Sequence, residues 1–526
     1  MNPQLRRHFL ISMAGTTGAL AIGSFPASSD DNPIGRKLFP KHRRRRVIYN
    51  DDSDEQYFSW QDYIGTKITD EKSFVDARAS GTFNSAVDTF VWCVGNGSNP
   101  PWAGRPKVYD FLGSSDGATD VIIKALHARG IEVWGSLRMN DIHDSFMAAN
   151  LAETTDKLKA EHPEYLITPQ DQRPPDKEIM ERALWTSFNY ARSEVRQHRL
   201  DFISNNASLH DFDGYELDFT RMPAFFRPGE GRASAHLMTQ LVRDVRGSLN
   251  SIANRRGRPY TLAVHALDSP DLSLDLGLDV KTWLEEDLVD VLVVGLGYLP
   301  YALHLYEWLA LGKRYSVQVY PSVNTNTYIS WKQRIGHAVF REAIRAHSAY
   351  YLQEGADGLY LFNFFPQGQV VPKDGLSHEV VRSVLTEIGD PKLLNGKDKL
   401  YGIQPASDGN FFVYRSEASP LPIALDNAEQ VLTLAIGPDA TDPEANARIR
   451  IWTTGGVTDM RVWARLNFKF LGEVSRVGDW YEVDVPQGIL RAGNNRLALW
   501  SDKPLSGTEN PLIVHNVFVP VTYSAR

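Results

Sequence analysis

The segment from Asp213 to Pro223 reads DGYELDFTRMP. Apolar and polar residues alternate from Tyr215 to Thr220, which is the period of a β-strand. At this period the carboxylates of Glu216 and Asp218 point to the same side of the strand. Two carboxylates on one face of a buried strand are costly unless they pair with cations, bind a metal or do chemistry. The segment therefore predicts a buried strand that carries either a functional or a structural carboxyl pair.

A structural pair would be neutralised by a nearby arginine, and Arg221 or Arg138 could supply that charge. A functional pair would belong to an active site, because carboxyl groups with perturbed pKa values gather at active sites. We favour the functional interpretation and keep the structural one open.

The chain around this segment alternates short apolar runs with longer amphipathic segments, from Arg46 to about Asp390. This alternation is typical of βαβ units in a parallel sheet. Eight strands are expected at residues 47–51, 89–94, 131–137, 214–219, 260–267, 289–295, 316–323 and 358–364. Helices are expected at residues 119–128, 233–253, 331–351 and 377–387. Eight parallel strands with right-handed crossovers close into a (β/α)8 TIM barrel, whereas a doubly wound open sheet is disfavoured because no glycine-rich phosphate turn follows any strand.

The pattern of apolar and polar residues changes after about residue 393, where the helical periodicity ends. Short alternating runs separated by turns rich in Gly, Asn, Asp and Pro predict an antiparallel, jelly-roll-like β-sandwich. Its strands are expected at residues 411–414, 431–436, 447–453, 459–464, 480–485, 496–500 and 512–522. We expect the sandwich to support the barrel by packing, and Trp452, Trp463, Trp480 and Trp500 to be core residues, because each tryptophan has a large area to bury.

The bulk composition limits the class of protein. The 526 residues suffice for a barrel and a second domain. The formal net charge of -8 argues against a general nucleic-acid binder. The single cysteine, Cys93, excludes an intramolecular disulfide and a multi-cysteine zinc site, and its apolar neighbours predict a buried core position.

The N-terminal residues resemble a targeting signal. Arg6 and Arg7 precede an apolar run at residues 11–25 that is too short and too weakly apolar for a membrane anchor. We expect a twin-arginine signal at residues 1–30, export to the periplasm or medium, and no stable membrane insertion after cleavage. Residues 31–45 are expected to form a basic, solvated linker. The barrel then spans residues 46–392 and the sandwich residues 393–526.

The carboxyl ends of barrel strands face the active site of TIM-barrel enzymes. The polar residues expected at this rim are Arg138, Asn140, Asp141, His143 and Asp144 after the third strand, Arg221 after the fourth, His265 and Asp268 at the fifth, Tyr298 after the sixth, Tyr320, Ser322 and Asn324 on the seventh, and Asn363 on the eighth.

Carbohydrates suit such a rim. Sugars offer apolar C–H faces to aromatic rings and hydroxyl groups to carboxylates, amides and arginines. Several aromatic residues lie on or near the same strands, although core packing is the commoner role for each: Trp92, Trp102, Trp134, Phe364 and Phe365. The expected substrate is a poly- or oligosaccharide, bound by Arg138, Asn140, Asp141, His143, Arg221, His265, Tyr298, Tyr320 and Asn363.

Hydrolysis of a glycosidic bond usually needs two carboxyl groups. Asp218, at the mouth of its strand, is the first choice for nucleophile or charge stabiliser. Glu216 lies one pleat repeat deeper and is either the acid or a group that orients Asp218. Asp268 and Asp141 are rival acids, and the residues alone do not rank the three.

Two other functions stay open. One is a glycan-binding protein without catalytic activity. The other is a metal-dependent hydrolase or lyase, because the chain offers suitable ligand types: Asp141, His143, Asp144, His265, Glu216 and Asp218. Their spacing matches no compact metal motif, so no metal or other cofactor is expected. No Gly-x-Ser-x-Gly sequence is present, which disfavours a serine hydrolase of that kind.

Residues 213–219 resemble the fourth-strand segment of glycoside hydrolase barrels, particularly family-10-like exported bacterial proteins. Residues 138–144 and 355–363 resemble further segments of such proteins. The resemblance spans roughly residues 46 to 370 and implies a carbohydrate-active barrel. Residues 493–500 similarly resemble β-sandwich modules that accompany carbohydrate-active enzymes.

The same strand is similar to the family 18 chitinase motif Asp-Gly-x-Asp-x-Asp-x-Glu. Asp213, Gly214 and Asp218 match it, and Glu216 stands in for the middle Asp. Thr220 falls where that family has its catalytic Glu, which argues against chitinase chemistry. In α-amylase-like and α-galactosidase-like barrels an Asp that ends the fourth strand is the nucleophile, and this resemblance implies that role for Asp218.

Overall fold

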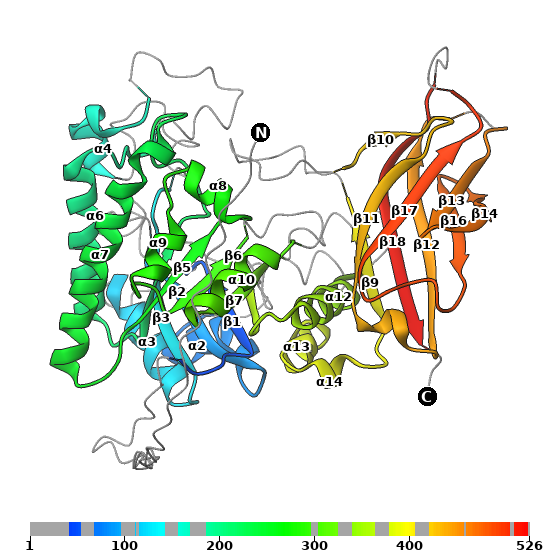
Figure 1. The fold of residues 1–526 in the computed structure, drawn as a ribbon. Coiled ribbons are helices and arrows are strands. Elements are labelled where there is room, and N and C mark those ends of the chain that lie inside the picture. The colour runs from blue at the N-terminus through cyan, green and yellow to red at the C-terminus, as the bar shows by residue number, and fades with distance from the viewer. Residues whose placement is uncertain are drawn as a thin grey trace, which may run out of the picture. The chain divides into compact units, whose positions relative to one another are not determined.

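The computed structural model describes residues 42–53, 68–95, 111, 115–141, 156–168, 186–295, 303–324, 339–362, 378–404, 420–456, 459–504 and 510–523. Eight parallel strands pair in chain order and close into a barrel, with β8 returning to pair with β1 (Figure 1). They are β1 (Val47–Asp51), β2 (Val87–Cys93), β3 (Glu132–Arg138), β4 (Gly214–Asp218), β5 (Thr261–Ala266), β6 (Val291–Val294), β7 (Gln318–Asn324) and β8 (Leu359–Phe362). The predicted barrel is confirmed, and each predicted strand end lies within two residues of the observed one.

Helices cover the outside of the barrel, and α6 and α7 lie side by side there (Figure 1). The helices are α2 (Glu71–Arg78), α3 (Ser115–His127), α4 (Lys157–Glu161), α6 (Ser193–Leu209), α7 (Gly231–Arg256), α8 (Pro270–Asp275), α9 (Val280–Glu285), α10 (Tyr306–Tyr315), α12 (Val339–Glu354), α13 (His378–Glu387) and α14 (Pro391–Leu394). None of these described helices has the length and hydropathy needed to span a membrane.

Helix α7 illustrates why the amphipathic segments became helices. Gly257, at a φ of 66°, ends it in the left-handed conformation that glycine adopts without strain. Its buried apolar residues recur every three or four positions and face the barrel: Met238, Leu241, Val245, Leu249 and Ile252.

Four aspartates at the start of the even-numbered strands tie each one to the preceding strand. Each carboxylate accepts a hydrogen bond from a backbone N–H at the start of that preceding strand. The pairs are Asp88 with Arg46, Asp213 with Val133, Asp290 with Leu262 and Asp357 with Val319, at 2.8–2.9 Å. Asp213 of the quoted segment therefore has a structural role at the opposite end of β4 from Asp218.

An ion pair fills the amino-terminal end of the barrel. Arg45 is fully buried, and its guanidinium bonds both oxygens of Glu132 at 2.7 and 2.9 Å. The Thr89 hydroxyl donates to the same carboxylate, and the guanidinium lies 4.8 Å from the Trp134 ring centre. The prediction of a solvated linker is wrong for Arg45, because a carboxylate buried in the barrel requires a cation beside it.

Two antiparallel sheets form the C-terminal part of the chain, as predicted. One has the order β10-β18-β12-β16-β15 with β9 also paired to β18, and the other has the order β11-β17-β13-β14. Their strands are β9 (Lys399–Ile403), β10 (Ile423–Ala424), β11 (Gln430–Ile436), β12 (Ala445–Thr454), β13 (Val462–Leu466), β14 (Lys469–Glu473), β15 (Ser475–Val477), β16 (Trp480–Val485), β17 (Gly493–Ser501) and β18 (Ile513–Tyr523). The sequence analysis missed β9, β10, β14 and β15, and its expected strand at residues 411–414 lies outside the described residues. The division between the domains at residue 393 stays a prediction.

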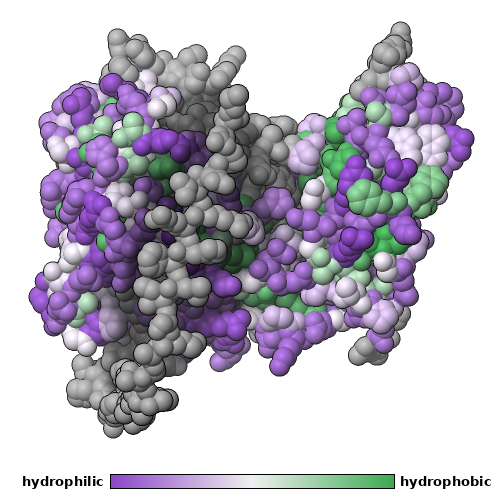
Figure 2. Space-filling model, in the orientation of Figure 1, coloured by the Kyte–Doolittle hydropathy of each residue, from purple (hydrophilic) through white to green (hydrophobic). Residues whose placement is uncertain are grey.

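None of the four sandwich tryptophans is fully buried, so the prediction of core positions is wrong, although Trp480 packs against the core from a partly buried position. Trp452, Trp463, Trp480 and Trp500 are all only partly buried. Alternate positions of each strand face inward, and the smaller Val462 and Ala464 take the inward positions of β13. This part of the chain also exposes Val431, Phe468, Phe470 and Val477, and it carries green patches among purple ones in Figure 2.

Candidate active site

The side chains that point into the barrel form layers, each drawn from alternate strands, as in other TIM barrels. The strand registers give a lower layer of Ile48, Trp134, Ala263 and Tyr320, then a layer of Val91, Glu216, Val293 and Tyr360, and then a layer of Asn50, Ser136, His265 and Ser322. The lower layers are mostly apolar and close the lumen. Above the Arg45–Glu132 ion pair the lumen is therefore mostly apolar as far as Glu216, and polar side chains become more frequent from Glu216 toward the carboxyl ends of the strands.

Gly214 is required below this point of β4. A Cβ atom at this position would lie 2.6 Å from the ring of Trp134 on β3. The glycine of the quoted segment thus makes room for the tryptophan that fills the lower layer.

Glu216 is fully buried in the lumen. Its Oε2 accepts hydrogen bonds from the Ser136 hydroxyl at 2.5 Å and the Tyr360 hydroxyl at 3.1 Å. Its Oε1 is buried and has no hydrogen-bond partner among the described residues. Burial, together with the neighbouring Asp218 carboxylate, raises the pKa of Glu216 to about 8. At neutral pH the group is therefore protonated, and the proton belongs on Oε1 because Oε2 already accepts two hydrogen bonds.

Asp218 is the last residue of β4, and the described hydrogen bonds to its carboxylate all end on one oxygen, Oδ1. Its Oδ1 accepts from the Thr220 backbone N–H and the Thr220 hydroxyl, both at 2.8 Å, and from the Arg221 N–H at 3.3 Å. No described residue donates to Oδ2. Thr220 is thus a group that orients Asp218, which agrees with its departure from the chitinase motif.

His265 lies beside Asp218 on β5. Its Nε2 donates to the Gly295 carbonyl at 2.8 Å, so Nδ1 is the nitrogen that faces Asp218, 3.9 Å from Oδ1. Burial lowers the pKa of His265, and the Asp218 carboxylate only partly opposes this effect. The imidazole is therefore neutral near pH 7, and it packs 4.9 Å from the Tyr360 ring.

Two predicted arginines belong to an ion-pair network above this layer. Asp52, just after β1, binds Arg138 through Oδ1 at 2.9 Å and Arg221 through Oδ2 at 3.1 Å. Arg138 also pairs with Asp141 at 2.9 Å. The arginines thus neutralise Asp52 and Asp141, whereas Glu216 and Asp218 have no ion pair with either of them in the described part of the chain. The arginine pairing on which the structural interpretation of the Glu216–Asp218 pair depends is therefore not made among the described residues.

Asn140 serves the scaffold and is not available to a substrate through its amide hydrogens. Both are donated to backbone carbonyls, of Phe188 at 3.0 Å and of Ala224 at 2.5 Å, and its Oδ1 accepts from the Phe188 N–H. Asp141 is buried against Arg138, and its carbonyl accepts from Lys159. Both residues position the rim.

Tyr320 lies at the wrong depth to bind a substrate at the rim, so this prediction is wrong. Its ring belongs to the lower apolar layer, and its hydroxyl accepts a hydrogen bond from the Arg45 backbone N–H at 3.1 Å. The reason is that β7 begins at Gln318, which leaves Tyr320 near the amino-terminal end. Trp92 and Trp134 are core residues, as the commoner role of aromatics predicts.

Several predicted residues lie outside the described part of the chain: Trp102, His143, Asp144, Tyr298, Asn363, Phe364 and Phe365. Asp268 is buried two residues after β5, at the same rim as Asp141 and Asp218. It lies beside Gly295. Burial raises the pKa of the Tyr351 hydroxyl on α12, and the charge of Asp268 adds a smaller effect in the same direction. No described contact joins Asp268 to Glu216 or Asp218.

The sequence analysis missed Asp52, Ser136 and Tyr360. Asp52 directly follows the first predicted strand. It could have been found by the expectation used for the later strands, that polar residues at the carboxyl ends of barrel strands face the active site. Ser136 and Tyr360 sit inside predicted strands, where only the direction of the side chain makes them part of the site.

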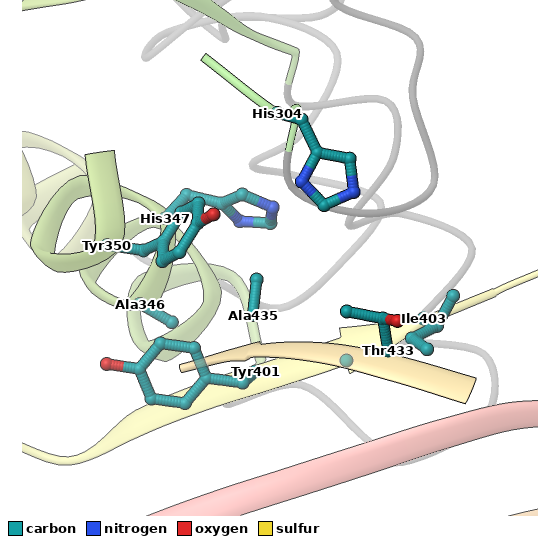
Figure 3. A pocket seen from close by; sticks show the side chains of 9 residues that line it. His304, Ala346, His347, Tyr350, Tyr401, Ile403, Thr433 and Ala435 are labelled. Atoms are coloured by element: carbon teal, nitrogen blue, oxygen red, sulfur yellow. The ribbon is translucent and has the colours of Figure 1, made fainter. Parts of the chain in front are cut away.

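A small cavity outside the lumen offers no comparable chemistry. Figure 3 shows that its walls come from α12, β9 and β11, with His304 facing them. The residues labelled on these elements are Ala346, His347, Tyr350, Tyr401, Ile403, Thr433 and Ala435. Burial lowers the pKa of His347 to about 4, and no carboxyl group lines the cavity among the described residues. Within that same part of the chain, no three His, Cys, Asp or Glu side chains are grouped as metal ligands would be.

No protein-family model matches the chain, and no curated protein matches it in sequence. Solved structures that resemble it include an α-amylase from Anoxybacillus, 13% identical with a TM-score of 0.40 over 88% of this chain and 98% of that one. A chitinase from Bacillus thuringiensis is 11% identical with a TM-score of 0.40, over 89% and 100% of the two chains. An α-galactosidase from Geobacillus stearothermophilus is 12% identical with a TM-score of 0.37, over 89% and 56%. All three are glycoside hydrolases. The barrel fold of this chain is established by its own strand pairing and not by these similarities.

Proposed function

We propose that this protein is a glycoside hydrolase whose acid is Glu216 and whose nucleophile or base is Asp218. The observation that carries the proposal is the difference between the two carboxyl groups. They share one face of β4, yet Glu216 holds a proton on an oxygen that has no partner among the described residues, whereas Asp218 is oriented by described donors to a single oxygen. Two carboxyl groups with separate protonation states are what glycosidic hydrolysis requires.

The chemistry follows from these roles. Glu216 donates its Oε1 proton to the leaving oxygen while the bond from that oxygen to the anomeric carbon breaks. The Asp218 carboxylate stabilises the positive charge that develops on the sugar, and it either attacks the anomeric carbon or takes a proton from the attacking water. The neutral His265 adds no positive charge next to the sugar cation.

Activity assays of matched variants test the proposal. Wild-type protein is expected to hydrolyse a panel of aryl glycosides and oligosaccharides, and Asp218→Asn is expected to lose turnover while keeping its fold. Full activity of Asp218→Asn on the natural glycan would remove this carboxylate from the mechanism. Binding of glycans without turnover by the wild type would instead favour the glycan-binding alternative.

Export is part of the same proposal and is supported by Arg6, Arg7 and the weakly apolar run behind them. Residues 1–41 lie outside the described residues. Fusion of residues 1–35 to a reporter that is active only after export of the folded protein tests it, and Arg6→Lys/Arg7→Lys is the matched control. Equal export of both fusions would contradict a twin-arginine signal.

A further inference from the structure

Two polar side chains of the lumen have unpartnered atoms that the proposed acid and nucleophile do not explain. Asn50 on β1 is 3% exposed and Ser322 on β7 is 7% exposed. Neither Asn50 Oδ1 nor Ser322 Oγ has a hydrogen-bond partner among the described residues. Buried polar atoms are nearly always bonded in proteins, so each such atom calls for a ligand or an ordered water.

The two residues belong to the layer directly above Glu216. Ser322 pairs in register with Tyr360, and Asn50 lies one pleat above Ile48, which pairs with Tyr360 from the other side. Asn50 and Ser322 thus flank β8 on its two sides. The other two members of the layer are engaged within the protein, Ser136 with Glu216 and His265 with the Gly295 carbonyl.

The chemistry of this layer is uncharged. The amide oxygen of Asn50 and the hydroxyl group of Ser322, with the protonated Glu216 one layer below, offer hydrogen bonds of both directions, but none carries a charge at neutral pH. The nearest described cations, Arg138 and Arg221, are engaged by Asp52 one layer higher. A carboxylate on the ligand would meet Asp218 and, among the described residues, no unengaged cation at this depth, which is unfavourable in a buried site.

We infer that Asn50 and Ser322, together with the Glu216 carboxyl group, form the floor of the glycosyl-binding site, and that Asn50 and Ser322 bind hydroxyl groups of an uncharged sugar unit. This inference rests on the proposed function, because it takes the lumen above Glu216 as the substrate site. Asn50 accepts a hydrogen bond from a sugar hydroxyl, and Ser322 donates to or accepts from another.

The test uses paired 4-nitrophenyl glycosides, the glucoside with the glucuronide and the galactoside with the galacturonide, in both anomeric forms where obtainable. Wild-type protein should hydrolyse at least one neutral glycoside and discriminate against its uronide partner by a factor of about 100 or more, since a site without a matching charge rejects a buried anion. Equal or better hydrolysis of a uronide would overturn the inference.

Variants then separate a binding role from a structural one. Asn50→Leu and Ser322→Ala should each lower kcat/KM for the neutral glycoside about tenfold, the loss expected for one hydrogen bond. Their Tm should stay equal or rise, because each change removes an unsatisfied buried atom. Ser273→Ala is the control, a buried serine of α8 whose hydroxyl is bonded to the Ser269 carbonyl, and kcat/KM should not change. A fall in Tm with unchanged kcat/KM would assign Asn50 and Ser322 to the scaffold.

The experiments distinguish an error in the inferred sugar-binding role of Asn50 and Ser322 from an error in the proposed glycosidase activity. If no glycoside is hydrolysed, calorimetric titration with the neutral methyl glycosides measures binding directly. Binding by the wild type that is weakened about tenfold in Asn50→Leu would retain the floor and reject the hydrolase. Absence of binding of every neutral glycoside to the wild type would reject the floor.

Discussion

The hydroxyl group of Tyr360 on β8 donates a hydrogen bond across the barrel lumen to Glu216 Oε2 on β4, at 3.1 Å. The two strands stand opposite each other in the closed sheet, so this bond spans the lumen. The Ser136 hydroxyl donates a second hydrogen bond to the same oxygen, at 2.5 Å. The geometry therefore leaves Oε1 to carry the proton of Glu216.

Removal of this donor should raise the pKa of Glu216 further, because a hydrogen bond to a carboxylate favours its charged form. For Tyr360→Phe we expect the alkaline limb of the kcat/KM profile, near pH 8 in the wild type, to move to higher pH. Tyr320→Phe is the control, since its hydroxyl bonds to the Arg45 backbone in the lower part of the lumen and should not affect the limb. A shift to lower pH in Tyr360→Phe would contradict the proposed network.

Glu216→Gln should abolish the alkaline limb and lower turnover severely, because the amide cannot donate a proton to the leaving oxygen. Glycosides with good leaving groups should be partly spared, since they need little protonation. Kinetics with aryl glycosides of graded leaving-group pKa measure this. Equal losses for good and poor leaving groups would instead make Glu216 a group that orients Asp218.

Asp268→Asn is the comparison variant for the leaving-group experiment. Asp268 is buried at the same rim, and the sequence offers it as an alternative acid to Glu216. We expect a small effect that does not depend on the leaving group, because no described contact joins Asp268 to the two carboxyl groups of β4. Selective rescue by good leaving groups in Asp268→Asn, without rescue in Glu216→Gln, would move the acid to the fifth strand.

Asp218→Asn should lower kcat by several orders of magnitude with little change in Tm, because the amide keeps the shape of the carboxylate but loses its charge. Thr220→Val should be milder, roughly a 10- to 100-fold loss, since it removes one oriented donor to Oδ1 and leaves the charge. Circular dichroism and thermal unfolding check the fold. A Thr220→Val loss as large as that of Asp218→Asn would contradict this division of roles.

The barrel could be predicted from sequence because its strands are continuous apolar runs between amphipathic segments, and the pleat alone puts Glu216 and Asp218 on one face. Depth in the lumen could not be predicted in the same way. It depends on the stagger between strands, which is a property of the closed sheet. Tyr320 was therefore placed at the rim although it lies in the lower part of the lumen, and Tyr360 was overlooked although it contacts Glu216.

The raised pKa of Glu216 also predicts how stability depends on pH. Below its ordinary pKa of about 4.5, folded and unfolded chains both hold the proton. Between there and about pH 8 the unfolded chain releases it and the folded chain keeps it, so the free energy of unfolding falls by up to about 1.4 kcal/mol per pH unit as pH rises. Urea unfolding of wild type and Glu216→Gln from pH 5 to 9 measures the difference. Parallel curves for the two proteins would contradict the raised pKa.

The ion pair in the lower part of the lumen should contribute to stability and not to catalysis. Arg45→Met leaves the buried Glu132 without its cation and should lower the free energy of unfolding by about 3–5 kcal/mol. Arg46→Met is the matched control, because Arg46 is 48% exposed in its pair with Asp88 and the loss should be below about 1 kcal/mol. The double variant Arg45→Met/Glu132→Leu should recover much of the loss, since it removes the unpaired charge. In their folded state all three variants should have the kcat/KM of the wild type. Similar losses of unfolding free energy in Arg45→Met and Arg46→Met would contradict the prediction that burial makes the Arg45–Glu132 pair the more important one for stability.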